Sequence, residues 1–194
     1  MSQEAVVRAA FLLLAMSASG AAHVLWLRTG LSRRFGWPVD GGLRFRGRRL
    51  FGDNKRVCGF MVLPPATGLT FMLLGGSREL LPAGLAAGLW PLTAWQYAGL
   101  GVVCGLAFML AELPNSFVKR QLGIAPGQAP VQPWLRPIIM LVDRYDSVLG
   151  VLIVLSLLVP VPFLTWLLVL LLGPAVHAVF SILLHSLGLK ARAL

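Results

Sequence analysis

Residues 147–189 read SVLGVLIVLSLLVPVPFLTWLLVLLLGPAVHAVFSILLHSLGL and contain no Lys, Arg, Asp or Glu. A helix that crosses a membrane needs about 20 mostly apolar residues, so this stretch is long enough for two. Its middle, Val159-Pro160-Val161-Pro162, predicts a turn because proline disfavours helix at the residue before it. The stretch therefore predicts two membrane spans joined by a tight turn.

Three further apolar stretches precede this hairpin, and they cover residues 5–27, 57–76 and about 92–113. In the second, Pro64-Pro65 is expected to bend the helix or to split it. Residues 77–95 are interrupted by proline and glycine, which favours a re-entrant or interfacial segment. We expect an all-α integral membrane protein with about five transmembrane helices.

The composition supports this class over the whole chain. Of the 194 residues 57% are apolar and 12% are charged, and the mean hydropathy is +0.80. A soluble domain of this size could not bury so much apolar surface, and a disordered chain would be far more polar. We therefore expect one transmembrane domain, residues 1–194, with two polar loops at about 28–56 and 114–146.

The basic residues are distributed unevenly between the two ends of the predicted spans. The chain has 17 Lys and Arg against 7 Asp and Glu, and only Arg8 and Arg78 lie outside the two polar loops and the C-terminus. The positive-inside rule then places both loops and the C-terminus in the cytoplasm and the N-terminus outside, in the cytoplasmic membrane. Topology accounts for the net charge of +10, so we expect no nucleic-acid partner.

The cysteines and histidines show no metal-binding spacing. Cys58 and Cys104 are interpreted as small apolar core residues. His23, His177 and His185 lie in spans, and we interpret them as core histidines whose hydrogen bonds are satisfied within the protein.

Two aspartates stand three residues apart directly before the fourth span. If that helix begins near Asp143, its carboxylate and that of Asp146 lie on one face, about 5–6 Å apart at Cβ. Two such oxygen ligands suit Mg²⁺, which takes one or two carboxylates together with substrate phosphates. The alternative, acidic residues that complement the helix dipole at its N-terminus, stays open at this point.

A second polar group follows the third span. Glu112, Ser116 and Lys119 share a helix face if the helix continues through Pro114. Asn115 and Arg120 lie beside this face, and Ser, Lys and Arg are side chains that bind phosphate oxygens. Lys119 and Arg120 could equally be basic residues at the end of a span that extend to the lipid headgroups. This alternative does not explain the polar residues Glu112, Asn115 and Ser116 at the same depth.

The first loop ends in a third polar group, Gly52-Asp53-Asn54-Lys55. Glycine permits close approach of the backbone to a phosphate, although the four residues also make an ordinary turn. Upstream, Gly41-Gly42 and the alternating Leu43-Arg44-Phe45-Arg46 favour a short ribbon or an interfacial segment.

Together these segments resemble the CDP-archaeol synthases, membrane cytidylyltransferases related to the phosphatidate cytidylyltransferases. The resemblance is carried by Arg49-Leu50-Phe51-Gly52-Asp53-Asn54-Lys55, by Glu112-Leu113-Pro114-Asn115-Ser116-Phe117-Val118-Lys119-Arg120-Gln121-Leu122-Gly123-Ile124 and by Asp143-Arg144-Tyr145-Asp146. It departs from the archaeal pattern at Arg56-Val57-Cys58-Gly59, and the Gly-His-Gly-Gly stretch of the bacterial enzymes is absent from the second loop.

The resemblance implies transfer of CMP from CTP to an archaetidic or phosphatidic acid-like lipid phosphate, which gives a CDP-lipid and pyrophosphate. It implies that Mg²⁺ is held by Asp143 and Asp146 with Glu112. Lys119, Arg120, Ser116 and Asn115 would act on the reacting phosphates, and Gly52, Asp53, Asn54 and Lys55 would bind substrate. A monovalent cation and a homodimer are both compatible with it.

Two other classes were weighed against this one. A small transporter or channel is the alternative, but it would place polar residues near mid-span rather than at one membrane face. A CDP-alcohol phosphotransferase is rejected because this chain has only two aspartates in the second loop, three residues apart.

Overall fold

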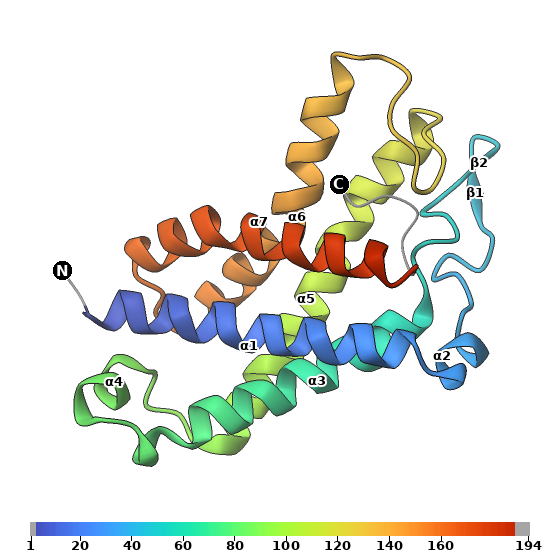
Figure 1. Ribbon diagram of the computed structural model, residues 1–194. Helices are drawn as coiled ribbons and strands as arrows, with labels where there is room; N and C mark the ends of the chain where they lie inside the picture. Colours follow the sequence, from blue (N-terminus) through green and yellow to red (C-terminus); the bar gives the residue numbers. More distant parts are fainter. Residues whose placement is uncertain (1–2, 189–194) are drawn as a thin grey trace.

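The computed structural model describes residues 3–188, without the side chains of residues 33, 177, 181 and 184. Five long helices dominate this part of the chain (Figure 1), and they are α1 (Gln3–Leu27), α3 (Val57–Gly76), α5 (Ala94–Gln121), α6 (Leu135–Leu158) and α7 (Phe163–Ser186). The all-α class is therefore confirmed. The shorter elements are α2 (Gly30–Arg34), β1 (Arg44–Phe45), β2 (Arg48–Arg49), a 3-10 turn η1 (Arg78–Leu80) and α4 (Ala83–Gly88).

In the described part of the chain four helical segments are long and apolar enough to cross a membrane, and they are Gln3–Leu27, Val57–Leu80, Ala94–Gln121 and Phe163–Phe180. α6 is as long as α7, but its first half carries four charged residues, which leaves residues 147–158 as its apolar part. Residues 77–93 hold η1 and α4, both too short to cross a membrane, and α5 begins at Ala94; a re-entrant or interfacial position for this stretch stays a prediction. The expected turn at residues 159–162 separates α6 from α7.

Helices continue through residues that were expected to split a helix or to form a loop. α3 is one helix with Pro64 and Pro65 inside it, so the prolines do not split it. α5 runs through Pro114 to Gln121, and α6 begins at Leu135. The second polar loop is therefore residues 122–134 rather than 114–146, and the polar residues predicted in it lie on helices.

Small residues bring α5 against α3. A Cβ atom added at Gly101 would lie 2.4 Å from the carbonyl oxygen of Thr67, and one at Gly105 would lie 2.7 Å from Cα of Pro64. Membrane helices gain little from the hydrophobic effect among themselves, so close backbone packing of this kind is their main source of association. α5 packs against α6 on another side and in this way holds the two polar helices together.

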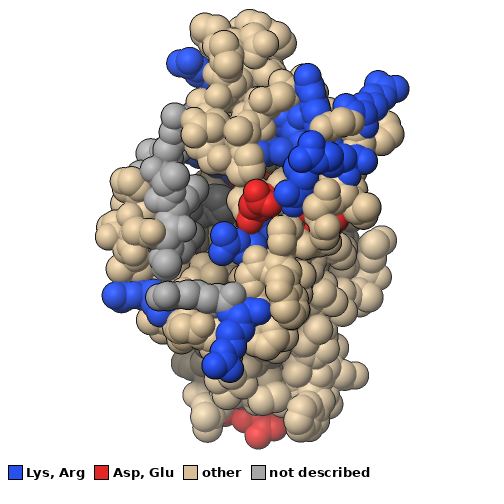
Figure 2. All heavy atoms as spheres, turned by 90° about the vertical axis from the view of Figure 1, so that its right-hand side faces the viewer, with Lys and Arg blue, Asp and Glu red and all other residues tan. Residues whose placement is uncertain are grey.

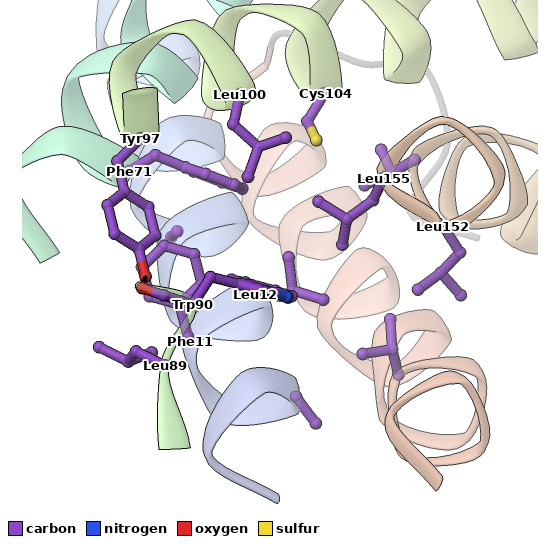
Figure 3. Packing of buried hydrophobic residues seen from close by; sticks show 14 residues of the cluster. Phe11, Leu12, Phe71, Leu89, Trp90, Tyr97, Leu100, Cys104, Leu152 and Leu155 are labelled. Atoms are coloured by element: carbon purple, nitrogen blue, oxygen red, sulfur yellow. Dashed lines mark hydrogen bonds between the residues drawn. The ribbon is translucent and has the colours of Figure 1, made fainter. Parts of the chain in front are cut away.

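The buried core joins residues of α1, α3, α5, α6 and α7 and includes Leu89 and Trp90 from the segment before α5 (Figure 3). Phe11 of α1 packs edge-to-face on Phe71 of α3, with ring centroids 4.9 Å apart. Cys104 is buried in the same cluster and Cys58 is buried outside it, both as free thiols, which confirms their interpretation as apolar core residues.

The end opposite the polar loops is held together by partly buried hydrogen bonds. Arg8 lies 5.0 Å from the ring centroid of Trp90 and donates to the carbonyl oxygen of Pro160 at 3.0 Å. The indole N–H of Trp90 donates to the same oxygen at 2.8 Å. These contacts join the start of α1 and the segment before α5 to the turn between α6 and α7.

Candidate active site

The polar residues predicted on α5 and α6 face one another. The Asn115 Nδ2 group donates to Asp143 Oδ1 at 2.5 Å and to Asp146 Oδ2 at 2.8 Å. Lys119 Nζ lies 2.5 Å from the same Asp143 oxygen. Asp143 lies in the third turn of α6 and Asp146 in the fourth, so the alternative that they complement the N-terminus of a helix is wrong.

Ser147 extends these contacts to a third carboxylate. Its hydroxyl lies 3.0 Å from Asp146 Oδ1 and 3.0 Å from Glu112 Oε1. Glu112 Oε2 forms an ion pair with Lys55, which comes from the end of the first loop. We call the resulting chain of polar contacts the carboxylate network, and its members are Lys55, Glu112, Asn115, Lys119, Asp143, Asp146 and Ser147.

Sequence reasoning missed Ser147, which was read as the first residue of a span. Ser147 is buried, and its backbone N–H also donates to Asp146 Oδ1 at 2.6 Å. Its position next to an aspartate at the polar start of an apolar stretch was the available signal. Ser116, by contrast, is 2% exposed and makes no hydrogen bond to the carboxylate network within the described part of the chain.

Arg120 is buried beside the glycine of the first-loop turn. It is 6% exposed, and its Nε and Nη1 atoms have no hydrogen-bond partner among the described residues. Gly52 adopts φ +92°, and a Cβ there would lie 2.9 Å from Cγ of Pro126 and 3.5 Å from Nη1 of Arg120. Only glycine fits this backbone position, so the guanidinium and the turn are held in close contact.

The rest of the first-loop turn divides into two parts. Asn54 and Lys55 line a cavity between the helices. Asp53 is 70% exposed at its side chain and pairs with Arg49 at 2.8 Å, so the structure does not bring it to the carboxylate network. The expected ribbon upstream is confirmed as the antiparallel pair β1 and β2.

Asp40 organises this turn, and sequence reasoning gave it no role. Its Oδ2 accepts from the N–H groups of Phe51 at 2.9 Å and Gly52 at 3.1 Å, and its Oδ1 accepts from Arg49 at 2.6 Å. Burial favours a raised pKa for this carboxyl, but the hydrogen bonds from Arg49 and from the loop backbone outweigh it and hold the pKa well below its usual range. An aspartate followed by two glycines in a polar loop was the signal for it.

A cavity of about 320 Å³ opens onto the carboxylate network. Its wall is mostly apolar and comes from the five long helices; Leu12 and Leu152 (Figure 3) belong to both this wall and the core. Lys55 and Glu112 form part of its polar end. The cavity therefore joins a hydrophobic volume to a charged site.

Charge gathers at this end of the molecule. Figure 2 shows Lys and Arg side chains around a patch of acidic atoms on the face that carries the loops. The polar residues of the site thus lie at one end of the bundle. A transporter or channel would need polar residues near mid-span. The transporter alternative is not supported.

A bundle of apolar helices with a cluster of cations and carboxylates at one end defines a multi-pass membrane protein with a site suited to phosphate groups. The chain belongs to the CDP-archaeol synthase family, because the family model described as CarS-like, CDP-archaeol synthase matches residues 9–193.

Curated relatives agree with the family model. The CDP-archaeol synthase of Thermofilum pendens is 34% identical over 155 residues, which are 79% of this chain and 64% of that protein. Those of Methanoculleus marisnigri and Halobacterium salinarum are 28% and 33% identical and cover 80% of this chain, and the matches span 88% and 82% of those proteins. The chain thus spans somewhat less than two thirds of the first relative. No solved structure matches it.

Proposed function

We propose that this chain is a cytidylyltransferase that transfers CMP from CTP to a lipid phosphate and releases pyrophosphate. The observation that carries the proposal is the cavity whose apolar wall ends at Lys55 and Glu112. A lipid phosphate likewise has an apolar part and a charged part: its hydrocarbon chains are stabilised by burial, and its dianionic phosphate is stabilised by a nearby cation. The names of the relatives, CDP-archaeol synthases, support the same reaction.

The lipid phosphate is oriented by the first-loop turn and by α5. Lys55 would exchange its ion pair with Glu112 for the phosphate of the lipid, and the amide of Asn54 at the cavity wall would donate to a further oxygen. The apolar wall excludes water from the chains and so fixes the depth at which the phosphate stops. One phosphate oxygen is then held facing the nucleotide.

The triphosphate is held from the other side of the site. Arg120 offers two buried N–H groups without partners in the described residues, next to the Gly52 turn. Lys119 lies one residue away and would offset further charge. The lipid phosphate oxygen attacks the α-phosphorus of CTP, the bond from this phosphorus to the bridging oxygen breaks, and pyrophosphate leaves with that electron pair. Positioning and charge neutralisation provide most of the rate in such transfers.

Asp143 and Asp146 fit a magnesium ion. They lie one turn apart on α6 and share the amide of Asn115 as a hydrogen-bond donor. Two carboxylates in this arrangement suit Mg²⁺, which takes one or two carboxylates together with substrate phosphates. Bound there, the ion would neutralise charge on the reacting phosphates. Glu112 as a third ligand and a monovalent cation stay predictions.

The orientation and the lipid are part of the proposal. CTP is a cytoplasmic nucleotide, and the basic residues gather at the end that carries the site, so we place this end, with the C-terminus, in the cytoplasm and the N-terminus outside. The relatives' names favour an ether-linked, archaetidic acid-like substrate over phosphatidic acid. A homodimer stays a prediction.

The experiment is incubation of the purified protein with labelled CTP, Mg²⁺ and lipid phosphates, both ether-linked and ester-linked. We expect a CDP-lipid and pyrophosphate in equal amounts, faster with the ether lipid. Glu79→Gln changes an exposed carboxylate remote from the site and is the control for Asp146→Asn. If no lipid phosphate gives a CDP-lipid, the proposed function is wrong.

A further inference from the structure

His23 is a polar side chain that the carboxylate network does not use. It lies in α1, four residues before the end of that helix at Leu27. Its Nε2 atom is buried and makes no hydrogen bond to any residue that the structure describes. The interpretation of His23 as a core histidine with satisfied hydrogen bonds is therefore wrong. His185, at the end of α7, is exposed, and the side chain of His177 lies outside the described residues.

The surroundings of His23 indicate what would satisfy this atom. The imidazole is part of the wall of the 320 Å³ cavity, and a Cβ added at Gly59 of α3 would lie 3.8 Å from Nε2. A buried polar group without a partner costs about 1–3 kcal/mol, so such groups are rare and those at a cavity point to a ligand. Arg8 and Trp26 also carry unpaired nitrogens in the described part of the chain, but neither lines this cavity.

The position of His23 along the helix gives the depth of that ligand atom. Four residues of α-helix span about 6 Å, so His23 lies about one turn deeper than the end of α1. The charged end of the same cavity is formed by Lys55 and Glu112, and the wall beyond His23 is formed by apolar side chains such as Leu12 and Met16. His23 therefore lies between the place for a phosphate and the place for hydrocarbon chains.

We propose that His23 Nε2–H donates a hydrogen bond to an oxygen of the glycerol backbone of the lipid phosphate. This inference rests on the proposed function, because it needs a lipid phosphate in the cavity. In a glycerol-based lipid the oxygens that link the chains follow directly after the phosphate, and ether or ester oxygens can only accept a hydrogen bond. His23 is thus a positioning residue that favours glycerol-based lipids over simple alkyl phosphates.

Two substitutions of similar size separate the hydrogen bond from the packing. His23→Met has no donor, whereas His23→Gln keeps an N–H group on a side chain of similar length. We expect His23→Met to raise KM for the glycerol-based lipid phosphate about tenfold, the equivalent of one lost hydrogen bond, with kcat and KM for CTP unchanged within twofold. His23→Gln should recover most of the loss, and Glu79→Gln, at an exposed position remote from the cavity, is the control.

A second ligand tests whether the glycerol oxygen is the atom that accepts the hydrogen bond from His23. A branched alkyl monophosphate without glycerol oxygens is used as a competitive inhibitor, and its inhibition constant should be the same in the parent protein and in His23→Met. Melting temperatures in detergent check folding, and His23→Leu replaces His23→Met if the latter does not fold.

The outcomes separate this inference from the proposed function. If the parent protein forms no CDP-lipid, the proposed function fails. If the parent protein is active and His23→Met keeps its KM for the glycerol-based lipid, the role of His23 is overturned while the function stands. Equal weakening of the lipid and of the alkyl phosphate would show a packing effect and would also overturn it.

Discussion

Replacement of Asn115 by leucine tests whether one amide holds the two aspartates of the site together. The Nδ2 group donates to Asp143 at 2.5 Å and to Asp146 at 2.8 Å. A hydrogen bond to a charged group contributes about 1.5–3 kcal/mol, and Asp143 is 42% exposed at its side chain, so we count only the bond to Asp146 in full. At about 1.4 kcal/mol per factor of ten, Asn115→Leu should weaken Mg²⁺ roughly 10- to 100-fold.

The assay is CDP-lipid formation at saturating CTP and lipid phosphate over a range of Mg²⁺ concentrations. We expect the half-saturating Mg²⁺ concentration to rise by this factor, with activity partly restored at high Mg²⁺. Gln121→Leu is the matched control, because it also removes an amide from α5 but loses only a 3.4 Å contact to the Arg49 carbonyl. A half-saturating concentration within twofold of the parent protein would falsify the view that Asn115 positions the carboxylates.

Four further results are expected from the same site and loop. Asp146→Asn should abolish Mg²⁺-dependent CDP-lipid formation while the melting temperature stays within a few degrees; full activity would remove Asp146 from the metal site. Lys119→Ala should lower kcat at least tenfold. An unchanged rate would mean that Lys119 only interacts with lipid headgroups at the end of the span. Gly52→Ala should destabilise the protein by about 1–3 kcal/mol through its φ of +92° and the contact with Pro126. In thermal denaturation, adding Pro126→Ala to Gly52→Ala should restore only the part of the stability that is lost to the steric contact, and the part lost to the positive φ should remain. Because the pKa of Asp40 is held below its usual range, its contribution to stability is complete above about pH 4 and is lost as the pH falls further. Asp40→Asn removes the same charge at pH 7, so trypsin should cut residues 28–56 of this variant at pH 7 but not those of the parent protein. Equal resistance of the two proteins would contradict this.

Several features followed from the sequence because they depend on local patterns. Long apolar runs with few charges predict membrane helices, and the turn at residues 159–162 was expected from its prolines. A ribbon that includes Arg44 and Phe45 was expected from the alternation there, but its partner strand Arg48–Arg49 was not. The sequence also indicated several residues of the site. In an apolar chain each carboxylate and amide stands out, and Glu112 and Asn115 were chosen for this reason.

Other features could not be read from local patterns. Pro64 and Pro65 were expected to bend or split α3, but α3 is one helix packed on α5, because neighbouring helices supply the stabilisation that the missing N–H groups do not. Ser147 looked like the start of a span, and only the approach of α5 to α6 shows that its hydroxyl joins Asp146 to Glu112. Asp40 lies 12 residues before Gly52, and only the folded loop shows that it holds this turn.

The sequence by itself determined that this protein lies in a membrane, which of its ends is basic and which residue types are available for phosphate chemistry. These properties depend on composition and on spacing along the chain. Only the tertiary structure decided the pairing of the charges, because Lys55, Glu112 and Asp146 come from three separate segments. It alone decided that a cavity ends at Lys55 and Glu112, and that His23 lines this cavity with a buried Nε2 that has no partner among the described residues. Both depend on how five helices pack.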